Sequence, residues 1–265
     1  MVPLSAAVLP VLAAMASAAA AGGGPSAGAA AGHGSDRRPG GVWSATWQSG
    51  ISQGMQLSLG GMFGRGPAQQ NRLTATRTNV FRSRDSVQFY GWSTTDLRSG
   101  KPDFEAGVRY RTPLAKVAGG TVTGGGGLEH WNFQHVLGGT RDLALDSYLA
   151  WSGGEEAPVT ISANAKTLLL SGLPRGTFLC VQALHTKRLF STRGVTFALQ
   201  HGPAYVYSWH LYGKGGNRVL RYYGTLIASR GRWSGEFMLR PQAGLQPRIP
   251  DNRYWSVSIA RRFGG

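Results

Sequence analysis

From residue 42 to the C-terminus, apolar and polar side chains alternate in runs of about ten residues, separated by turn signals. The clearest runs are 54–63, 103–112, 143–151, 158–166, 204–212, 233–240 and 252–263. Gly, Pro, Asn and Asp gather between the runs, and no stretch keeps the apolar period of an amphipathic helix. The pattern therefore predicts an all-β domain of antiparallel strands joined by turns.

The last run places its large side chains on one face and small or polar side chains on the other. Its large face consists of Trp255, Val257, Ile259 and Phe263. Only two glycines follow Phe263, so the chain ends almost on an aromatic residue. This ending resembles the final strand of bacterial outer-membrane β-barrel proteins. The resemblance implies that the last strand pairs with the first and carries the signal for the barrel-assembly machinery.

Alternation alone is compatible with two architectures. A soluble sandwich or barrel buries its apolar face, whereas a membrane barrel turns that face toward lipid. Three features favour the membrane form: small residues on the polar faces, tryptophans at run ends, and run lengths close to the ~9–11 residues of a transmembrane strand. At roughly 19 residues per strand and connection, 42–265 predicts a single antiparallel barrel of about 12 strands, within a range of 10–14.

The composition agrees with many short strands. The chain has 40 glycines, 10% aromatic residues and only 15% charged residues. Its one cysteine, Cys180, excludes an internal disulfide, and we expect a packed, unreactive thiol.

The residues before the barrel form two segments. Residues 1–21 hold a short apolar stretch followed by Ala16-Ser17-Ala18, which predicts a cleaved signal peptide. Residues 22–41 are rich in Gly and Ala and predict a flexible tail. We therefore expect the bacterial outer membrane as the location, with the periplasm or secretion as the alternative.

The charges are strongly unbalanced, at a formal net charge of +16, and arginine accounts for 23 of the 28 basic residues. The basic residues are scattered along the chain, so we expect no nucleic-acid partner. The strand phases place several charged residues on the lumen side: Glu105, Arg109, Arg111, Asp146, Lys166, Glu236 and Arg240. These charges predict either a narrow polar channel that favours anionic solutes or an ion-pair network that closes the barrel.

Three arginines interrupt apolar faces: Arg77, Arg221 and Arg261. Because a guanidinium on the lipid side must reach water or lipid phosphate, we expect all three at the rims of the barrel.

The sequence contains few candidates for catalytic residues. No nucleotide-binding, zinc-protease or serine-hydrolase motif occurs, and the glycine run 124–127 lacks the lysine of a phosphate loop. Ser208 and His210 share one strand face, but the expected phase points both into the lumen rather than toward lipid. Glu129, His130 and His135 do not define a metal site, so we expect no cofactor and no metal.

Together these patterns predict a non-enzymatic outer-membrane barrel that acts as a small pore or in a structural or partner-binding role. The expected partners are outer-membrane lipids and lipopolysaccharide, the assembly machinery, and an anionic solute or a protein. Two alternatives stay open: a soluble β-sandwich or barrel that binds a ligand, and a lipid-acting hydrolase that uses Ser208 and His210.

Overall fold

The computed structural model describes residues 41–56, 62–63, 66–133, 139–154, 158–211, 213–246, 249 and 251–264. The expected signal peptide, and all of the expected tail except Gly41, lie outside these residues. The described part of the chain contains no helix long and apolar enough to cross a membrane.

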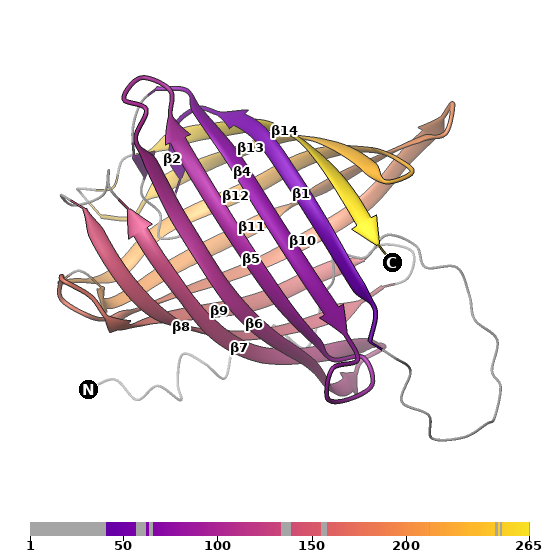
Figure 1. Ribbon diagram of the computed structural model, residues 1–265, viewed down its shortest axis with the longest axis horizontal. Coiled ribbons are helices and arrows are strands. Elements are labelled where there is room, and N and C mark those ends of the chain that lie inside the picture. The colour runs from indigo at the N-terminus through magenta and orange to yellow at the C-terminus, as the bar shows by residue number, and fades with distance from the viewer. Residues whose placement is uncertain are drawn as a thin grey trace.

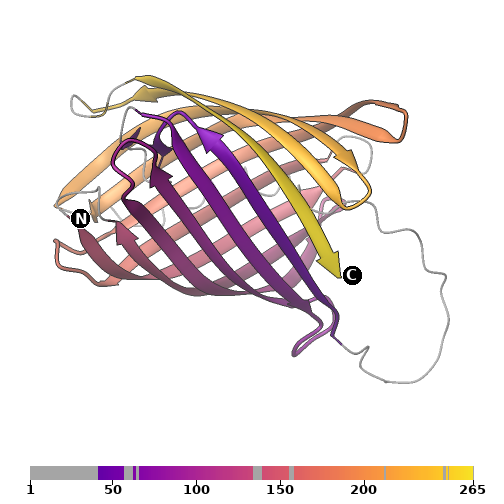
Figure 2. The ribbon, with the colours of Figure 1, turned by 45° about the horizontal axis from the view of Figure 1, so that its top comes forward.

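Twelve antiparallel strands form one closed barrel, with the first strand paired to the last. The strands are β1 (Trp43–Ser52), β4 (Ala68–Thr78), β5 (Ser86–Asp96), β6 (Pro102–Val117), β7 (Gly120–Phe133), β8 (Thr140–Gly153), β9 (Val159–Leu170), β10 (Thr177–Thr192), β11 (Val195–Leu211), β12 (Lys214–Arg230), β13 (Trp233–Gly244) and β14 (Asn252–Gly264). Figures 1 and 2 show the strands tilted around a common axis. The predicted fold class and strand number are confirmed, and closure removes every unpaired edge.

One predicted run does not become a barrel strand. Within 54–63 only β2 (Met55–Gln56) and β3 (Met62–Phe63) pair, as a separate two-stranded ladder in the β1–β4 connection. The run does alternate, but its residues follow Ser52 and precede Ala68, where the pairing of β1 with β4 ends. Residues 57–61, half of the run, fall outside the described residues.

The apolar faces point outward. Leu73, Phe89 and Val257 are 56%, 48% and 50% exposed, while their neighbours along the strands face the lumen. A soluble barrel would show the opposite arrangement, because it buries its apolar face. The outward apolar surface therefore assigns the exterior to lipid.

The tryptophans divide into two groups. Trp43, Trp47 and Trp233 are exposed near the end of the barrel where β1 begins and β14 ends, as an interfacial girdle requires. Trp92 lines the lumen instead, and Trp131 is 2% exposed inside it. Trp92 and Trp131 therefore do not belong to an interfacial girdle.

The lengths of the connections give the orientation. At the end where β1 begins and β14 ends, three hairpins leave only two residues between strands, and Ala118-Gly119 and Arg193-Gly194 take positive φ at both positions. The opposite end carries the longer connections, including 53–67 and 245–251. Barrels of this kind have short periplasmic turns, so the start of β1 and the end of β14 mark the periplasmic end, and the longer connections mark the extracellular end.

Two of the three interrupting arginines lie where expected. Arg77 and Arg261 are exposed in the last residues of β4 and β14, at the periplasmic rim, and lie over the rings of Trp43 and Trp233 at 5.8 and 5.1 Å. Arg221 is 2% exposed, and the neighbouring Leu220 and Tyr222 point outward. The expectation for Arg221 is therefore wrong, because β12 has the opposite phase and carries this arginine into the lumen.

Candidate functional site

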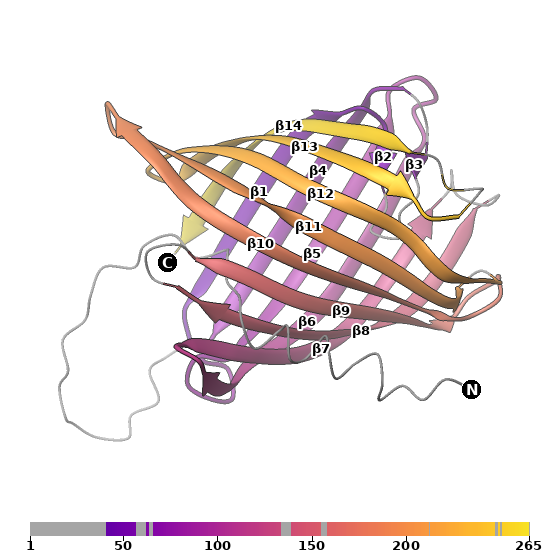
Figure 3. The ribbon, with the colours of Figure 1, turned by 180° about the vertical axis from the view of Figure 1, so that it is seen from behind.

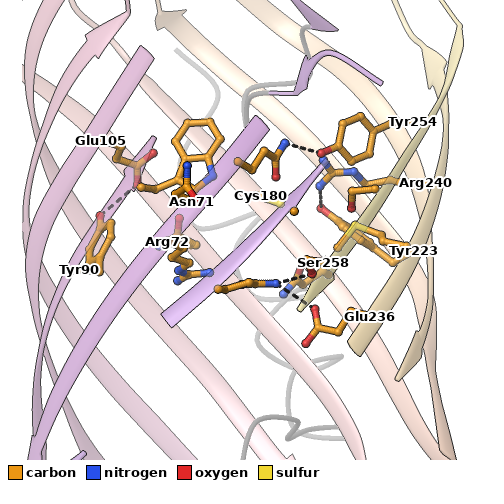
Figure 4. A pocket seen from close by; sticks show the side chains of 18 of the residues that line it. Asn71, Arg72, Tyr90, Glu105, Cys180, Tyr223, Glu236, Arg240, Tyr254 and Ser258 are labelled. Atoms are coloured by element: carbon orange, nitrogen blue, oxygen red, sulfur yellow. Dashed lines mark hydrogen bonds between the residues drawn. The ribbon is translucent and has the colours of Figure 1, made fainter. Parts of the chain in front are cut away.

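A chamber of about 530 Å³ lies inside the barrel at mid-height. Figure 4 shows side chains from opposite walls converging on it. Six of the charged residues expected in the lumen line this chamber: Glu105, Arg109, Arg111, Lys166, Glu236 and Arg240. The seventh, Asp146, is 1% exposed and is ion-paired with Arg109 beside the chamber.

A cluster of five charged side chains occupies the wall formed by β6 to β9. Arg109 is paired with Glu129 and, through Nε, with the Asp146 Oδ2 atom at 2.7 Å. Lys166 is paired with Glu129 and lies 3.5 Å from the Glu105 Oε1 atom. Three carboxylates and two cations share this wall, so the cluster is close to neutral.

Hydrogen bonds from two uncharged side chains complete the cluster. The Trp131 indole Nε1–H donates to Glu129 Oε2 at 3.1 Å, and the Tyr90 hydroxyl donates to Glu105 Oε1 at 3.1 Å. Arg109 also lies 4.2 Å over the Tyr90 ring. Buried charges require this degree of pairing, because an unpaired charge in a low-dielectric wall is costly.

The glycine run in β7 makes room for these contacts. Arg109 pairs in register with Gly127, and Gly127 pairs in turn with Asp146 on β8. The Arg109 side chain therefore crosses β7 above a residue that has no side chain. The same geometry recurs with Arg111, which crosses Gly125 and lies 4.1 Å over the Tyr148 ring.

The opposite wall presents arginine without paired carboxylates. The Arg240 guanidinium lies between the Tyr223 and Tyr254 rings, at 5.0 and 4.9 Å, and donates to the Tyr223 hydroxyl at 3.2 Å. Arg72 projects into the chamber from β4. Within the described residues, no carboxylate comes within ion-pair distance of Arg72 or Arg240, nor of Arg111 on the β6 wall.

Two guanidinium nitrogens on the chamber wall also lack hydrogen-bond partners. These are the buried Nε atoms of Arg111 and Arg240, for which the described part of the chain supplies no acceptor. The carboxylate on this side, Glu236, accepts from the Gln48 amide at 3.2 Å. The arginines therefore keep donor capacity that an anion could use.

The lumen is packed on the extracellular side of the chamber. Every barrel strand contributes a buried inward side chain there: Ser52, Ala68, Thr94, Asp103, Trp131, Asp142, Leu168, Phe178, Val206, Val219, Gln242 and Tyr254. We call this layer the cap. Its apolar part includes Trp131 and Phe178, whose ring centroids lie 6.3 Å apart.

The periplasmic side of the lumen is less filled. The inward side chains of Thr46, Thr76, Gln88 and Ser234 are small or polar and stay partly exposed. The inward side chains are therefore more deeply buried on the extracellular side of the chamber than on the periplasmic side.

The structure separates the residues of the expected catalytic pair. Ser208 is 0% exposed inside the lumen, as the expected phase required. His210 has a φ of 54° and lies within a register irregularity between Ser208 and Leu211, so it is exposed at the extracellular end. Ser208 does not face lipid, and this geometry gives no support to a lipid-cleaving site.

The other candidate residues do not converge either. Glu129 belongs to the charged cluster, His130 is exposed, and His135 lies outside the described residues. No cluster of three or more metal-binding side chains occurs in the described ranges. Cys180 lines the chamber without a disulfide partner.

Sequence reasoning missed the central role of Glu129. The signal was available, because extending the alternation of β7 through the glycine run places Gly125, Gly127 and Glu129 on one face. It also missed the tyrosines that surround the chamber arginines, because tyrosine occurs on both faces of a membrane barrel.

No protein-family model and no curated protein sequence matches the chain. Solved structures are similar in fold. The NanC porin aligns with a TM-score of 0.53 at 10% identity, over 82% of this chain and 98% of the porin. LpxR from Salmonella typhimurium aligns with a TM-score of 0.50 at 8% identity, over 82% of this chain and 99% of LpxR. The chain thus has the fold of bacterial outer-membrane β-barrel proteins.

Proposed function

We propose that this protein is a non-enzymatic outer-membrane barrel that binds a small anionic solute in its central chamber and is closed on the extracellular side. The observation that carries the proposal is the group of three chamber arginines without paired carboxylates: Arg72, Arg111 and Arg240. The lipid-facing exterior and the closed barrel support the bacterial outer membrane as its location.

Two of the chamber arginines are preorganised by neighbouring tyrosine rings. Tyrosine rings flank Arg111 and Arg240 and restrict their rotamers, so less entropy is lost when a guanidinium binds an anion. Guanidinium groups bind carboxylate and phosphate through two parallel hydrogen bonds. The solute class that follows is a small carboxylate or phosphate.

The cap supports a closed resting state. Its members come from all twelve strands, and the largest of them are almost fully buried. An open pore needs a continuous water path, which a dry apolar constriction interrupts.

Anion binding is testable by calorimetric titration of the refolded protein in detergent with sodium phosphate and with sodium citrate at low ionic strength. We expect binding that weakens at least tenfold in Arg240→Gln and weakens with added salt. Arg77→Gln, at the outer rim, is the matched control and leaves binding unchanged. Absence of binding by either anion, or equal binding by Arg240→Gln, would contradict the proposal.

An open anion pore is the second candidate, because the same arginines would line its path and the fold is similar to that of the NanC porin. We also propose that β14 acts as the assembly strand, with Trp255, Val257, Ile259 and Phe263 as its recognised face. The pairing of β14 with β1 and the 37–50% exposure of these four side chains support that role.

A further inference from the structure

The outer wall carries a hollow of about 660 Å³ that crosses β11, β12, β13 and β14. Figure 3 shows these four strands side by side on one face of the barrel. The outward side chains that line the hollow include Pro203, Leu220, Tyr222, Pro241, Ala243 and Arg253. We call it the outer groove.

Two prolines shape the outer groove. Pro203 pairs in register with Tyr222, and Pro241 pairs with Arg253. The short proline rings and the Ala243 methyl group leave space between longer neighbours such as Leu220, which is 50% exposed. The result is an apolar depression on a surface that otherwise carries large side chains.

A polar chain lies beside the groove, on the same lipid-facing side. The Tyr222 hydroxyl is 2.7 Å from His201 Nδ1, and His201 Nε2 is 3.3 Å from His185 Nδ1. When His185 donates to His201 and His201 donates to Tyr222, the Tyr222 hydroxyl proton is left to donate outward. Tyr222 can therefore offer one hydrogen bond to a ligand carbonyl within the groove.

The extracellular end of the groove is basic. Arg253 is the second residue of β14 and is exposed. Arg218 lies at the same end, near the start of β12 and two residues before the groove residue Leu220, and its buried Nε atom has no hydrogen-bond partner in the described chain. Asp251 is the acidic residue in the groove lining, and its Oδ1 atom accepts from the Gly244 N–H at 2.8 Å.

From this geometry we propose that the outer groove binds one phosphorylated lipid. The phosphate contacts Arg253 and Arg218, the acyl chain lies along Pro203, Leu220 and Pro241, and an ester carbonyl accepts from Tyr222. The occupant is a lipid because the groove opens onto the lipid-facing wall, and the two arginines complement a phosphate. This inference does not depend on anion binding in the chamber.

Native mass spectrometry of the detergent-refolded protein tests the proposal, with dilauroyl phosphatidic acid, dilauroylglycerol and inorganic phosphate as probes. We expect retention of one phosphatidic acid per barrel at concentrations where dilauroylglycerol is not retained, with or without inorganic phosphate bound in the chamber. Retention of phosphate alone would place the anion site elsewhere and overturn the proposal. Equal retention of both lipids would show an apolar surface without phosphate recognition, which also overturns it.

Two variants locate the site, each with a matched control. Ala243→Trp fills the groove from an exposed position, and Ala106→Trp adds the same bulk to the outward face of β6. Arg253→Gln removes a rim charge, and Arg77→Gln removes one from the opposite rim. We expect at least a tenfold loss of phosphatidic acid retention in Ala243→Trp and Arg253→Gln only. Equal retention in all four variants would refute the site.

Discussion

The pairing of Arg109 with Asp146 gives the sharpest prediction about stability. The two side chains are 14% and 1% exposed, and Arg109 also pairs with the fully buried Glu129. Replacing Arg109 with Gln leaves the three carboxylates of this cluster with Lys166 as their remaining ion-pair partner. Breaking a buried ion pair from one side costs ~3–5 kcal/mol. We expect the lower part of that range, about 3 kcal/mol, because Arg109 borders the open chamber.

A double-mutant cycle separates this pair from its surroundings. Asp146→Asn removes the carboxylate charge and keeps the shape, so it should cost less in the Arg109→Gln background than in the wild type. For two groups in direct contact we expect a coupling energy of about 1–3 kcal/mol. The measurement is the free energy of unfolding in urea, followed by tryptophan fluorescence and by gel mobility of unheated samples.

Arg111→Gln is the matched control. Arg111 lies over Tyr148 on the same wall and has no carboxylate partner in the described chain, so its loss should cost only about 1 kcal/mol. A coupling energy below ~0.5 kcal/mol between Arg109 and Asp146, or equal costs for Arg109→Gln and Arg111→Gln, would refute the reasoning.

Three further predictions concern the glycine run, a periplasmic turn and the last strand. Gly127→Leu should destabilise the barrel by at least the ~3 kcal/mol expected for Arg109→Gln. The leucine Cβ would meet the Val108 carbonyl oxygen, and the rest of its side chain would occupy the path of Arg109. An unchanged free energy of unfolding in urea would contradict this prediction. Burial favours a raised pKa for Asp85, but hydrogen bonds from the backbone N–H groups of 80–82 and from the Tyr110 hydroxyl outweigh burial and hold this pKa below its ordinary value. The ionised carboxylate therefore stabilises the turn above about pH 4, and its contribution is lost as the pH falls through the lowered pKa. Asp85→Asn should narrow the difference in melting temperature between pH 7 and pH 3, and an unchanged difference would argue against this role. Phe263→Ser should lower the amount of folded barrel in cells several-fold and leave refolding in detergent intact, whereas an equal loss in both would show a folding defect instead.

The alternation of apolar and polar residues predicted the lumen and lipid faces best in strands that carry charged residues on only one face. In β6 the set Glu105, Arg109 and Arg111 opposes Phe104 and Val108, so period two was enough to assign lumen and lipid. In β12 large apolar side chains occupy both faces, because the cap and the chamber use Val219 and Tyr223 while lipid contacts Leu220 and Tyr222. Hydrophobicity carries no phase information in such a strand.

The candidate site was predictable in its charges and not in its closure. Whether lumen charges line a channel or close it depends on which of them touch, and that depends on the register across four strands. Gly125 and Gly127 let Arg111 and Arg109 reach β8, but this role cannot be predicted until the register of β6, β7 and β8 is known. The cap was hidden because Trp131 and Phe178 look like lipid-facing residues in the sequence.

Planar-bilayer conductance of the refolded protein tests the closed barrel most directly. We expect no steady conductance for the wild type in 1 M potassium chloride, where electrostatic interactions between exposed charges are strongly screened. Phe178→Ala, which removes a fully buried ring from the cap, should produce openings that favour anions. Steady wild-type channels, or a silent Phe178→Ala variant that is shown to be folded by its gel mobility, would contradict closure by the cap.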